Sequence, residues 1–376
     1  MLTPQETLIT LNLIPGLGSM RIQALLEFFG SAELVLSAPE SLLSQVPRIG
    51  SKLAAAIADW RNCTNARAEM ECAEQYGVRI VTLLDAEYPS FLRRMSDPPV
   101  VLYVRGSWLE SDSDQSVAIV GTRQASPYGM TTARKFGREL AENGCTIISG
   151  LARGIDTAAH WGALDAGGRT IAVLGFGMAE IYPQENAELA ERICQGHGAI
   201  VSEFPMYMRP SRTTFPQRNR IVAAWSRATL VVEAPNRSGS LHTASMAAAE
   251  YGNSVFAIPG PIHQMSSTGC HSLIRDGAIL CTSPQELMDD MGWSRQATQL
   301  ELFDSPCEEK AEAPVLQPVS QAEAAELIQA LQQGHDTLDA LCSALGKGAH
   351  SITPLLMRLQ IERRVVPLPG GRFSAV

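Results

Sequence analysis

The sequence has no hydrophobic run that approaches the roughly 20 residues of a transmembrane helix. Its longest apolar stretches, such as TLVVEA from Thr229, are short and are broken by glycine or glutamate. The first residues, MLTPQETLITLNLIPG, contain neither a basic region nor a small-residue cleavage site, so we expect no export signal. These absences predict a cytoplasmic protein that has no membrane segment.

The eight cysteines are scattered along the chain, and no two of them form a C-x-x-C pair. This spacing argues against a zinc site and against a disulfide framework, so we expect no bound metal and mostly buried, reduced thiols. The sequence also has no G-x-x-x-x-G-K-[ST] loop, which disfavours a P-loop ATPase. No G-x-G-x-x-G follows the first strand of its central part, which disfavours NAD binding. We therefore expect no cofactor.

Positive charge is scarce overall and concentrated in one place. The formal net charge is -9, and residues 96–290 carry 15 basic against 19 acidic side chains, so the central region has no positive field as a whole. Residues 209–227, here called the arginine segment, nevertheless contain five arginines with no lysine and no acid. Because a planar guanidinium binds phosphate bidentately and stacks on flat rings, this segment predicts a local site for a polyanion such as nucleic acid.

From Val117 onward, apolar runs rich in β-branched residues alternate with amphipathic stretches. The runs are VAIVG, TIISG, TIAVLG, AIVSEF, ATLVVEA, SVFAIPG and AILCTS. This alternation is typical of β-α-β units whose parallel sheet is covered by helices on both faces. The predicted fold class is therefore α/β, with a doubly wound, mostly parallel Rossmann-like domain at residues 79–290. Its first part, residues 79–110, is a leading extension.

The N-terminal region contains a near-repeat. LNLIPGLGSMRIQALLEFF is echoed by LLSQVPRIGSKLAAAIADW, with Gly16, Gly18 and Gly50 at the turns. The pattern resembles the helix-hairpin-helix motif, whose tight turns can hold a DNA phosphate. Residues 1–78 are therefore predicted to form a helical domain, either as a DNA contact or as a packing module only.

The C-terminal region predicts a linker and a small domain. Residues 291–319 lose periodicity and are rich in acids and prolines, which indicates a solvated linker. From 320 to 376, short helices are followed by two strands around a Gly-Gly turn, which predicts a winged-helix domain. Its balanced charge leaves both DNA binding and protein docking open.

Several loops that follow the predicted strands carry glycine, serine or arginine. Ligands of parallel sheets bind beyond the carboxyl ends of the strands, where helix N-termini favour anions. These loops and the arginine segment predict a trough of backbone N–H, hydroxyl and guanidinium donors that holds several phosphates. The candidate site residues are Thr122, Arg123, Ser149, Gly150, Arg153, Gly154, Arg218, Asn219, Arg220, Arg237, Ser238, Gly239 and Ser240.

The motifs VAIVGTRQASPYG, SGLARGIDTAAH, VSEFP, FPQRNRIVA, LVVEAPNRSGSLHTA and VFAIPGP occur in this order. They resemble the DNA-processing protein A family (DprA, also called Smf), over nearly the whole chain except the acidic linker. The resemblance implies a protein that is not an enzyme, binds and protects single-stranded DNA, forms a homodimer and loads the RecA recombinase during natural transformation. Matched position by position, it identifies Arg123, Arg153, Arg218, Asn219 and Arg220 as phosphate-binding residues.

Other interpretations stay open. In one alternative, either Arg218 or Arg220 has a structural role and pairs with Glu203, Glu233 or Asp156. A second function class is a Rossmann-like nucleotide-processing enzyme similar to the phosphoribohydrolases, although the loop RSGSLHTA has no counterpart of their catalytic glutamate. If the DNA-binding interpretation is right, alanine in place of Arg153 or Arg218 weakens binding without unfolding the chain.

Overall fold

The computed structural model describes residues 2–293, 321–362, 364–368 and 372–375. The chain divides into two compact units, Met1–Arg295 and Gln296–Val376, which are treated separately below. Nearly all of the predicted linker lies outside the described residues. No helix in the described ranges is both long enough and apolar enough to cross a membrane.

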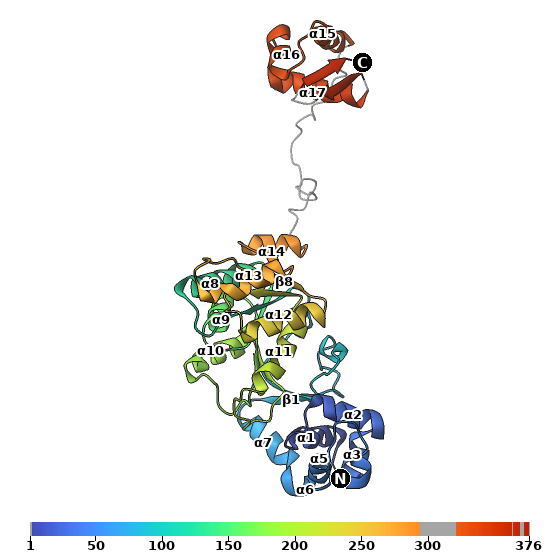
Figure 1. Ribbon diagram of the computed structural model, residues 1–376, viewed down its shortest axis with the longest axis vertical. Helices are drawn as coiled ribbons and strands as arrows, with labels where there is room; N and C mark the ends of the chain where they lie inside the picture. The colour runs from blue at the N-terminus through green and yellow to red at the C-terminus, as the bar shows by residue number, and fades with distance from the viewer. Residues whose placement is uncertain (1, 294–320, 363, 369–371, 376) are drawn as a thin grey trace, which may run out of the picture. The chain divides into compact units, whose positions relative to one another are not determined.

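A nine-stranded sheet runs through the first unit (Figure 1). Its strands, in chain order, are β1 Arg79–Thr82, β2 Val101–Gly106, β3 Ser116–Val120, β4 Thr146–Ser149, β5 Thr170–Leu174, β6 Gly198–Ser202, β7 Ala228–Val231, β8 Ser254–Ala257 and β9 Ile279–Leu280. Their order across the sheet is β1-β2-β6-β5-β4-β3-β7-β8-β9. The seven strands from β3 to β9 are parallel, whereas β2 pairs antiparallel with both β1 and β6. The mostly parallel α/β sheet predicted from the sequence is therefore confirmed.

Helices cover both faces of the parallel strands. Along β3, Val117 and Ile119 pack on one face and Ala118 and Val120 on the other, because successive strand residues point to opposite sides. The first face is covered by α8 Pro127–Glu142, α9 Ile155–Asp165 and α14 Pro284–Asp290. The second face is covered by α11 Thr214–Trp225, α12 Gly239–Ala249 and α13 Thr268–Arg275.

Helix α11 occupies the middle of the arginine segment, where the sequence pattern predicted no helix. Pro216 stands in its first turn, where a missing N–H costs little because that group has no partner within the helix. Ile221, Val222 and Trp225 are buried against the sheet. The segment is thus largely a packed helix, which holds its arginines at different depths.

Within residues 2–78, the chain forms seven helices, which gather beside β1 in Figure 1. They are α1 Pro4–Leu13, α2 Ser19–Phe29, α3 Ala32–Ser37, α4 Glu40–Leu43, α5 Ser51–Ala58, α6 Trp60–Cys63 and α7 Ala66–Gln75. They share an apolar cluster with β2, β5 and α10 (Ala187–Arg192). Both repeated turns are present, because Gly18 caps α2 and Gly50 caps α5. The helix-hairpin-helix assignment stays a prediction.

The described residues of the second unit form three helices and a two-stranded antiparallel sheet. These elements are α15 Gln321–Gln332, α16 Leu338–Leu345, α17 Ala349–Ile361, β10 Val365–Leu368 and β11 Arg372–Ala375. Leu327, Leu341, Ile352 and Leu356 are buried in its core. Helices followed by a hairpin were expected here. The Gly-Gly turn lies outside the described residues, and the winged-helix assignment stays a prediction.

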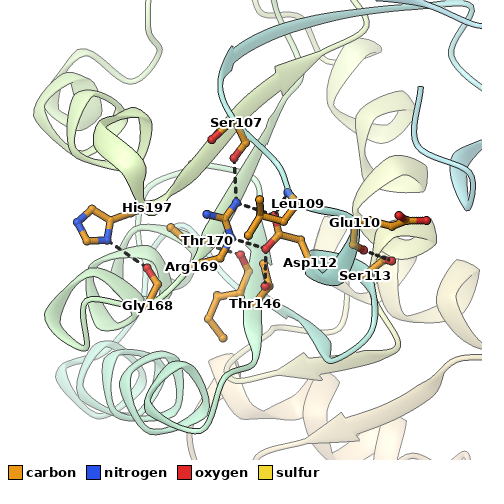
Figure 2. A network of polar contacts seen from close by, with 11 residues as sticks. Ser107, Leu109, Glu110, Asp112, Ser113, Thr146, Gly168, Arg169, Thr170 and His197 are labelled. Carbon is orange, nitrogen blue, oxygen red and sulfur yellow. Dashed lines mark hydrogen bonds and ion pairs between the residues drawn. The ribbon is translucent and has the colours of Figure 1, made fainter. Parts of the chain in front are cut away.

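A buried carboxylate holds together the amino-terminal edge of the parallel sheet (Figure 2). Asp112 is 1% exposed. It accepts hydrogen bonds from the backbone of Leu109 at 2.7 Å, the hydroxyl of Thr146 at 3.0 Å and the guanidinium of Arg169 at 2.7 Å. Arg169 also donates to the carbonyl oxygen of Ser107 at 2.9 Å. The network joins the chain before β3 to the starts of β4 and β5.

Alanine in place of Asp112 is expected to lower the free energy of unfolding by about 3 kcal/mol, because three buried or half-buried donors lose their acceptor. Urea unfolding measures the loss. Asp114→Ala is the matched control, since Asp114 is exposed and carries the same charge. Equal stability of the two variants would show that the Asp112 network does not hold this edge.

Candidate nucleic-acid interface

The carboxyl ends of the parallel strands meet at the edge of the sheet opposite Asp112. From β3 the chain adds β4, β5 and β6 on one side, and it then returns to add β7, β8 and β9 on the other. The order therefore reverses between β3 and β7. At such a switch point, the flanking loops diverge and leave a crevice in which open α/β sheets bind ligands.

The loops after β3 and β7 are joined across this switch point. The backbone N–H of Thr122 donates to the carbonyl oxygen of Glu233 at 2.7 Å. The carboxylate of Glu233 is buried, and it accepts hydrogen bonds from the backbone and hydroxyl of Ser126 at 2.9 and 3.1 Å. Ser126 also caps α8 through the N–H of Gly129. Glu233 therefore fixes both loops and is not free to contact a ligand.

The loop after β4 packs directly against the loop after β3. Gly154 caps α9 with φ at +78°, and a side chain there would clash with the carbonyl oxygen of Thr122. In the same loop Leu151 has φ at +55°, which is uncommon for a residue with a side chain. Its carbonyl oxygen accepts a hydrogen bond at 2.9 Å from the buried Asn186. Sequence reasoning missed Asn186, because a partner 35 residues away leaves no local signal.

Arg123 and Arg153 are exposed cations on these two loops. The guanidinium of Arg123 lies 4.4 Å from the ring centre of Phe215, and no described carboxylate is within ion-pair distance of it. Arg153 pairs with Glu185 at 2.7 and 3.0 Å, and these hydrogen bonds lower the pKa of Glu185. Both partners of this pair are more than half exposed, so it contributes little to stability, and a phosphate can replace the carboxylate.

Arg218 lies beneath the loop after β4 and is 4% exposed. Its guanidinium donates to the carbonyl oxygen of Val173 and lies so close to Gly150 that any side chain at position 150 would clash. Asp156 accepts hydrogen bonds from the backbone N–H groups of Gly150 at 3.1 Å and Ala152 at 3.4 Å. Arg218 and Asp156 therefore hold the loop from below.

The charges of this pair depend on each other. Burial lowers the pKa of Arg218 to about 10, and the charge of Asp156 opposes that shift. Burial raises the pKa of Asp156, and the charge of Arg218 opposes it. Arg218 thus stays charged at neutral pH. Asp156 therefore has a structural role, because it holds the backbone of the loop after β4.

Besides Arg218, two other predicted site residues have structural partners instead of open positions. Arg220 is 8% exposed and forms ion pairs with Asp97 at 3.1 Å and with Glu203, which confirms the structural alternative for this arginine. Ser149 is fully buried, and its hydroxyl donates to the carbonyl oxygen of Ile119 at 2.6 Å. This geometry argues against a direct phosphate contact by either side chain.

The loop after β7 leads into α12 and exposes Arg237 and Gly239, whereas the predicted site residue Ser240 is buried and its hydroxyl pairs with that of Ser238 at 2.7 Å. Ser238 caps the helix, and its hydroxyl accepts from the N–H of Ser240 at 3.3 Å. The amide of Asn219 donates to the carbonyl oxygen of Gly239 at 3.4 Å, which ties α11 to this loop. Arg237 is exposed and has no ion-pair partner among the described residues. Arg237 and the backbone of Gly239 are therefore the groups of this loop that an anion can reach.

The imidazole of His160, in α9, is fully buried and lies at the start of β5, away from the carboxyl edge. Its Nδ1 lies 2.7 Å from the hydroxyl of Thr170. Burial lowers the pKa of His160 to about 3, so the ring is neutral at physiological pH. This histidine is therefore a packed residue and is not placed to act as an acid–base catalyst.

Comparison with known proteins agrees with this architecture. Residues 79–292 match the family model of DNA recombination-mediator protein A. The sequence is 33% identical to the protein Smf of Synechocystis over 96% of both chains. The chain belongs to the DNA recombination-mediator protein A family.

Two solved structures of this family are similar to the chain. DNA processing protein A (DprA) from Streptococcus pneumoniae is 35% identical, with a TM-score of 0.66 over 77% of this chain and 98% of its own. DNA processing protein A from Helicobacter pylori is 31% identical, with a TM-score of 0.51 over 57% of this chain and 95% of its own. The latter structure is described as giving insight into that protein's single-stranded DNA binding mode.

Proposed function

We propose that this member of the family binds single-stranded DNA in a trough formed by the loops after β3, β4 and β7. The observation that carries the proposal is the placement of three exposed guanidinium groups, Arg123, Arg153 and Arg237, at one edge of the sheet. Buried contacts of Glu233 and Arg218 hold the loops that bear them. Such preorganised donors bind phosphates with little ordering cost.

A single strand suits this trough better than a duplex. A flexible strand can follow donors on several loops, and its bases can stack on aromatic or guanidinium planes such as the stacked Arg123–Phe215 pair. The net charge of -9 gives no long-range attraction to DNA, so binding depends on local contacts. The Helicobacter pylori relative, which was studied for its single-stranded DNA binding mode, supports this choice.

The wider role is proposed from the family resemblance. The protein protects incoming single-stranded DNA in the cytoplasm and loads the RecA recombinase during natural transformation. It acts as a homodimer. Ile262 and Met265 support self-association, because these apolar side chains are 78% and 75% exposed at the surface of the Rossmann-like domain.

We also propose that the protein is not an enzyme. The buried acids near the trough already have structural partners, since Glu233 holds two loops and Asp156 accepts hydrogen bonds from the backbone of the loop after β4. The loop RSGSLHTA at the start of α12 offers no carboxylate in place of the glutamate of the phosphoribohydrolases. This alternative therefore has less support.

Gel-shift titration of the whole chain with single- and double-stranded DNA of one sequence tests the proposed function. We expect a single-strand complex whose affinity falls steadily as the salt concentration rises. The slope of the logarithm of affinity against the logarithm of salt should be about -0.7 for each phosphate that the protein neutralises. Added nucleotide should change nothing. Tighter duplex binding, or an affinity that does not respond to salt, would argue against the trough, and nucleotide hydrolysis would favour the enzyme alternative.

A further inference from the structure

A groove of about 710 Å³ lies between the N-terminal helices and the arginine segment. One wall is the turn between α1 and α2, together with Met20, Arg21 and Arg48, and the other wall is formed by residues 204–217. The first turns of α11 separate this groove from the trough, because Gln217 lines the groove while Arg218 lies beneath the loop after β4. The groove and the trough therefore lie on either side of the first turns of α11.

The floor of the groove is a buried ionic cluster whose acids are already engaged. Arg220 pairs with Asp97 and Glu203, and the hydroxyl of Ser19 donates to Glu203 at 3.1 Å. Glu69, a further acid of the lining, accepts a backbone hydrogen bond at 2.7 Å. One oxygen of Glu203 and one nitrogen of Arg220 are buried and have no hydrogen-bond partner. Buried polar atoms of this kind need a further partner from water or from a ligand.

The rim of the groove carries exposed cations and apolar side chains, unlike its buried, ion-paired floor. Arg21 and Arg48 are exposed, and neither has an ion-pair partner among the described residues. Two large apolar side chains also stand open at the rim, since Tyr207 is 68% exposed and Met20 is 51% exposed. Unpaired cations beside an exposed aromatic ring are the combination with which proteins hold single-stranded nucleic acid.

Arg48 stands at an unusual backbone position. In the first turn of the near-repeat this position is Gly16, with φ at +81°, whereas Arg48 has φ at +68°. A residue with a side chain is strained in that region, and glycine is not. Glycine at position 48 therefore removes the cation while it fits the backbone better.

We propose that single-stranded DNA leaving the trough crosses the first turn of α11 and enters this groove. Tyr207 stacks on a base there, and Arg21 and Arg48 bind phosphates. The inference rests on the proposed function and extends it, because it makes the N-terminal helices part of the DNA interface. Affinity should then depend on whether an oligonucleotide is long enough to reach the groove.

Arg48→Gly and Tyr207→Ala test this path with two thymidine oligonucleotides, of about 6 and about 30 nucleotides, a range that spans short and long single-strand sites. We expect each variant to bind the long oligonucleotide about tenfold more weakly, as loss of one stacked base or one phosphate contact predicts, and to bind the short one unchanged. Arg192→Ala is the matched control for charge, because Arg192 is exposed at the end of α10 that faces away from the carboxyl edge.

Three results would overturn the inference. The first is unchanged affinity for the long oligonucleotide in Arg48→Gly and Tyr207→Ala chains whose unfolding temperatures match the parent. The second is an equal loss for both lengths, which would place these residues in the trough. The third is no binding of either length by the parent chain, in which case the proposed function fails as well.

Discussion

Alanine at both Arg123 and Arg153 is expected to weaken single-stranded DNA binding about 100-fold and to leave thermal unfolding unchanged. A hydrogen-bonded contact to a charged group contributes about 1.5 kcal/mol, so the loss of two such contacts costs about 3 kcal/mol. The fold should not respond, because Arg123 contacts the ring of Phe215 and Arg153 forms only a surface ion pair. Fluorescence anisotropy with a labelled oligonucleotide at fixed salt measures the affinity.

The matched control removes two arginines from another place. Arg138 and Arg192 are exposed near the C-terminal ends of α8 and α10, away from the trough. Alanine at both changes the net charge by the same amount. A similar loss in this control would show that long-range charge, and not local contact, sets the affinity. Parental affinity in the Arg123 and Arg153 double variant would place the DNA site elsewhere.

Methionine in place of Arg218 is expected to lower the free energy of unfolding by about 4 kcal/mol, since it removes the nearby buried charge that most stabilises the carboxylate of Asp156. DNA binding should fall as well, because the loop around Gly150 loses its support. From the sequence alone, replacement of Arg218 was expected to weaken DNA binding without unfolding the chain. Because Arg218 is buried, we now expect a loss of stability as well. Urea unfolding and anisotropy measure the two effects on the same variant.

The stability loss in Arg218→Met should depend on pH through Asp156. Burial raises the folded-state pKa of Asp156, and loss of the neighbouring cation raises it further. A folded-state pKa above the unfolded value means that the folded chain binds the proton more tightly, so stability rises as pH falls through that pKa. The deficit relative to the parent is therefore largest at neutral pH and shrinks in acid.

A second substitution separates this mechanism from a packing defect. Asparagine in place of Asp156 removes the buried charge, so the Arg218→Met, Asp156→Asn chain should recover part of the stability that Arg218→Met alone loses. A deficit that is the same at every pH and that Asp156→Asn does not reduce would show that the lost volume, and not the charge pair, explains the effect.

The parallel sheet was predictable because its signals are local. Runs such as VAIVG and TIAVLG are apolar and rich in β-branched residues, and Ser126 followed by Pro127 is a local signal for the start of α8. Glycines after the strands likewise located the loops at the carboxyl edge. Arg123, Arg153 and Arg237 could therefore be assigned to one edge without coordinates.

The depth of each arginine was not predictable, because it depends on partners far apart in the sequence. Helix α11 buries Arg218 and Arg220 on faces where apolar residues normally lie, so the segment lacks the usual helical pattern. Arg220 can be buried because it pairs with Asp97 and Glu203. Arg218 can be buried because Asp156 and the carbonyl oxygen of Val173 lie beside it. A cluster of arginines in sequence thus contains both ligand-facing and structural members.

The salt dependence of single-stranded DNA affinity tests the trough most directly, when it is measured on the parent and on the Arg123→Ala, Arg153→Ala chain. Each phosphate neutralised on a single strand contributes about 0.7 to the slope of the logarithm of affinity against the logarithm of salt. Loss of two phosphate contacts should therefore make the slope shallower by about 1.4. An unchanged slope in a folded double variant would contradict the account, because these two arginines would then neutralise no phosphate.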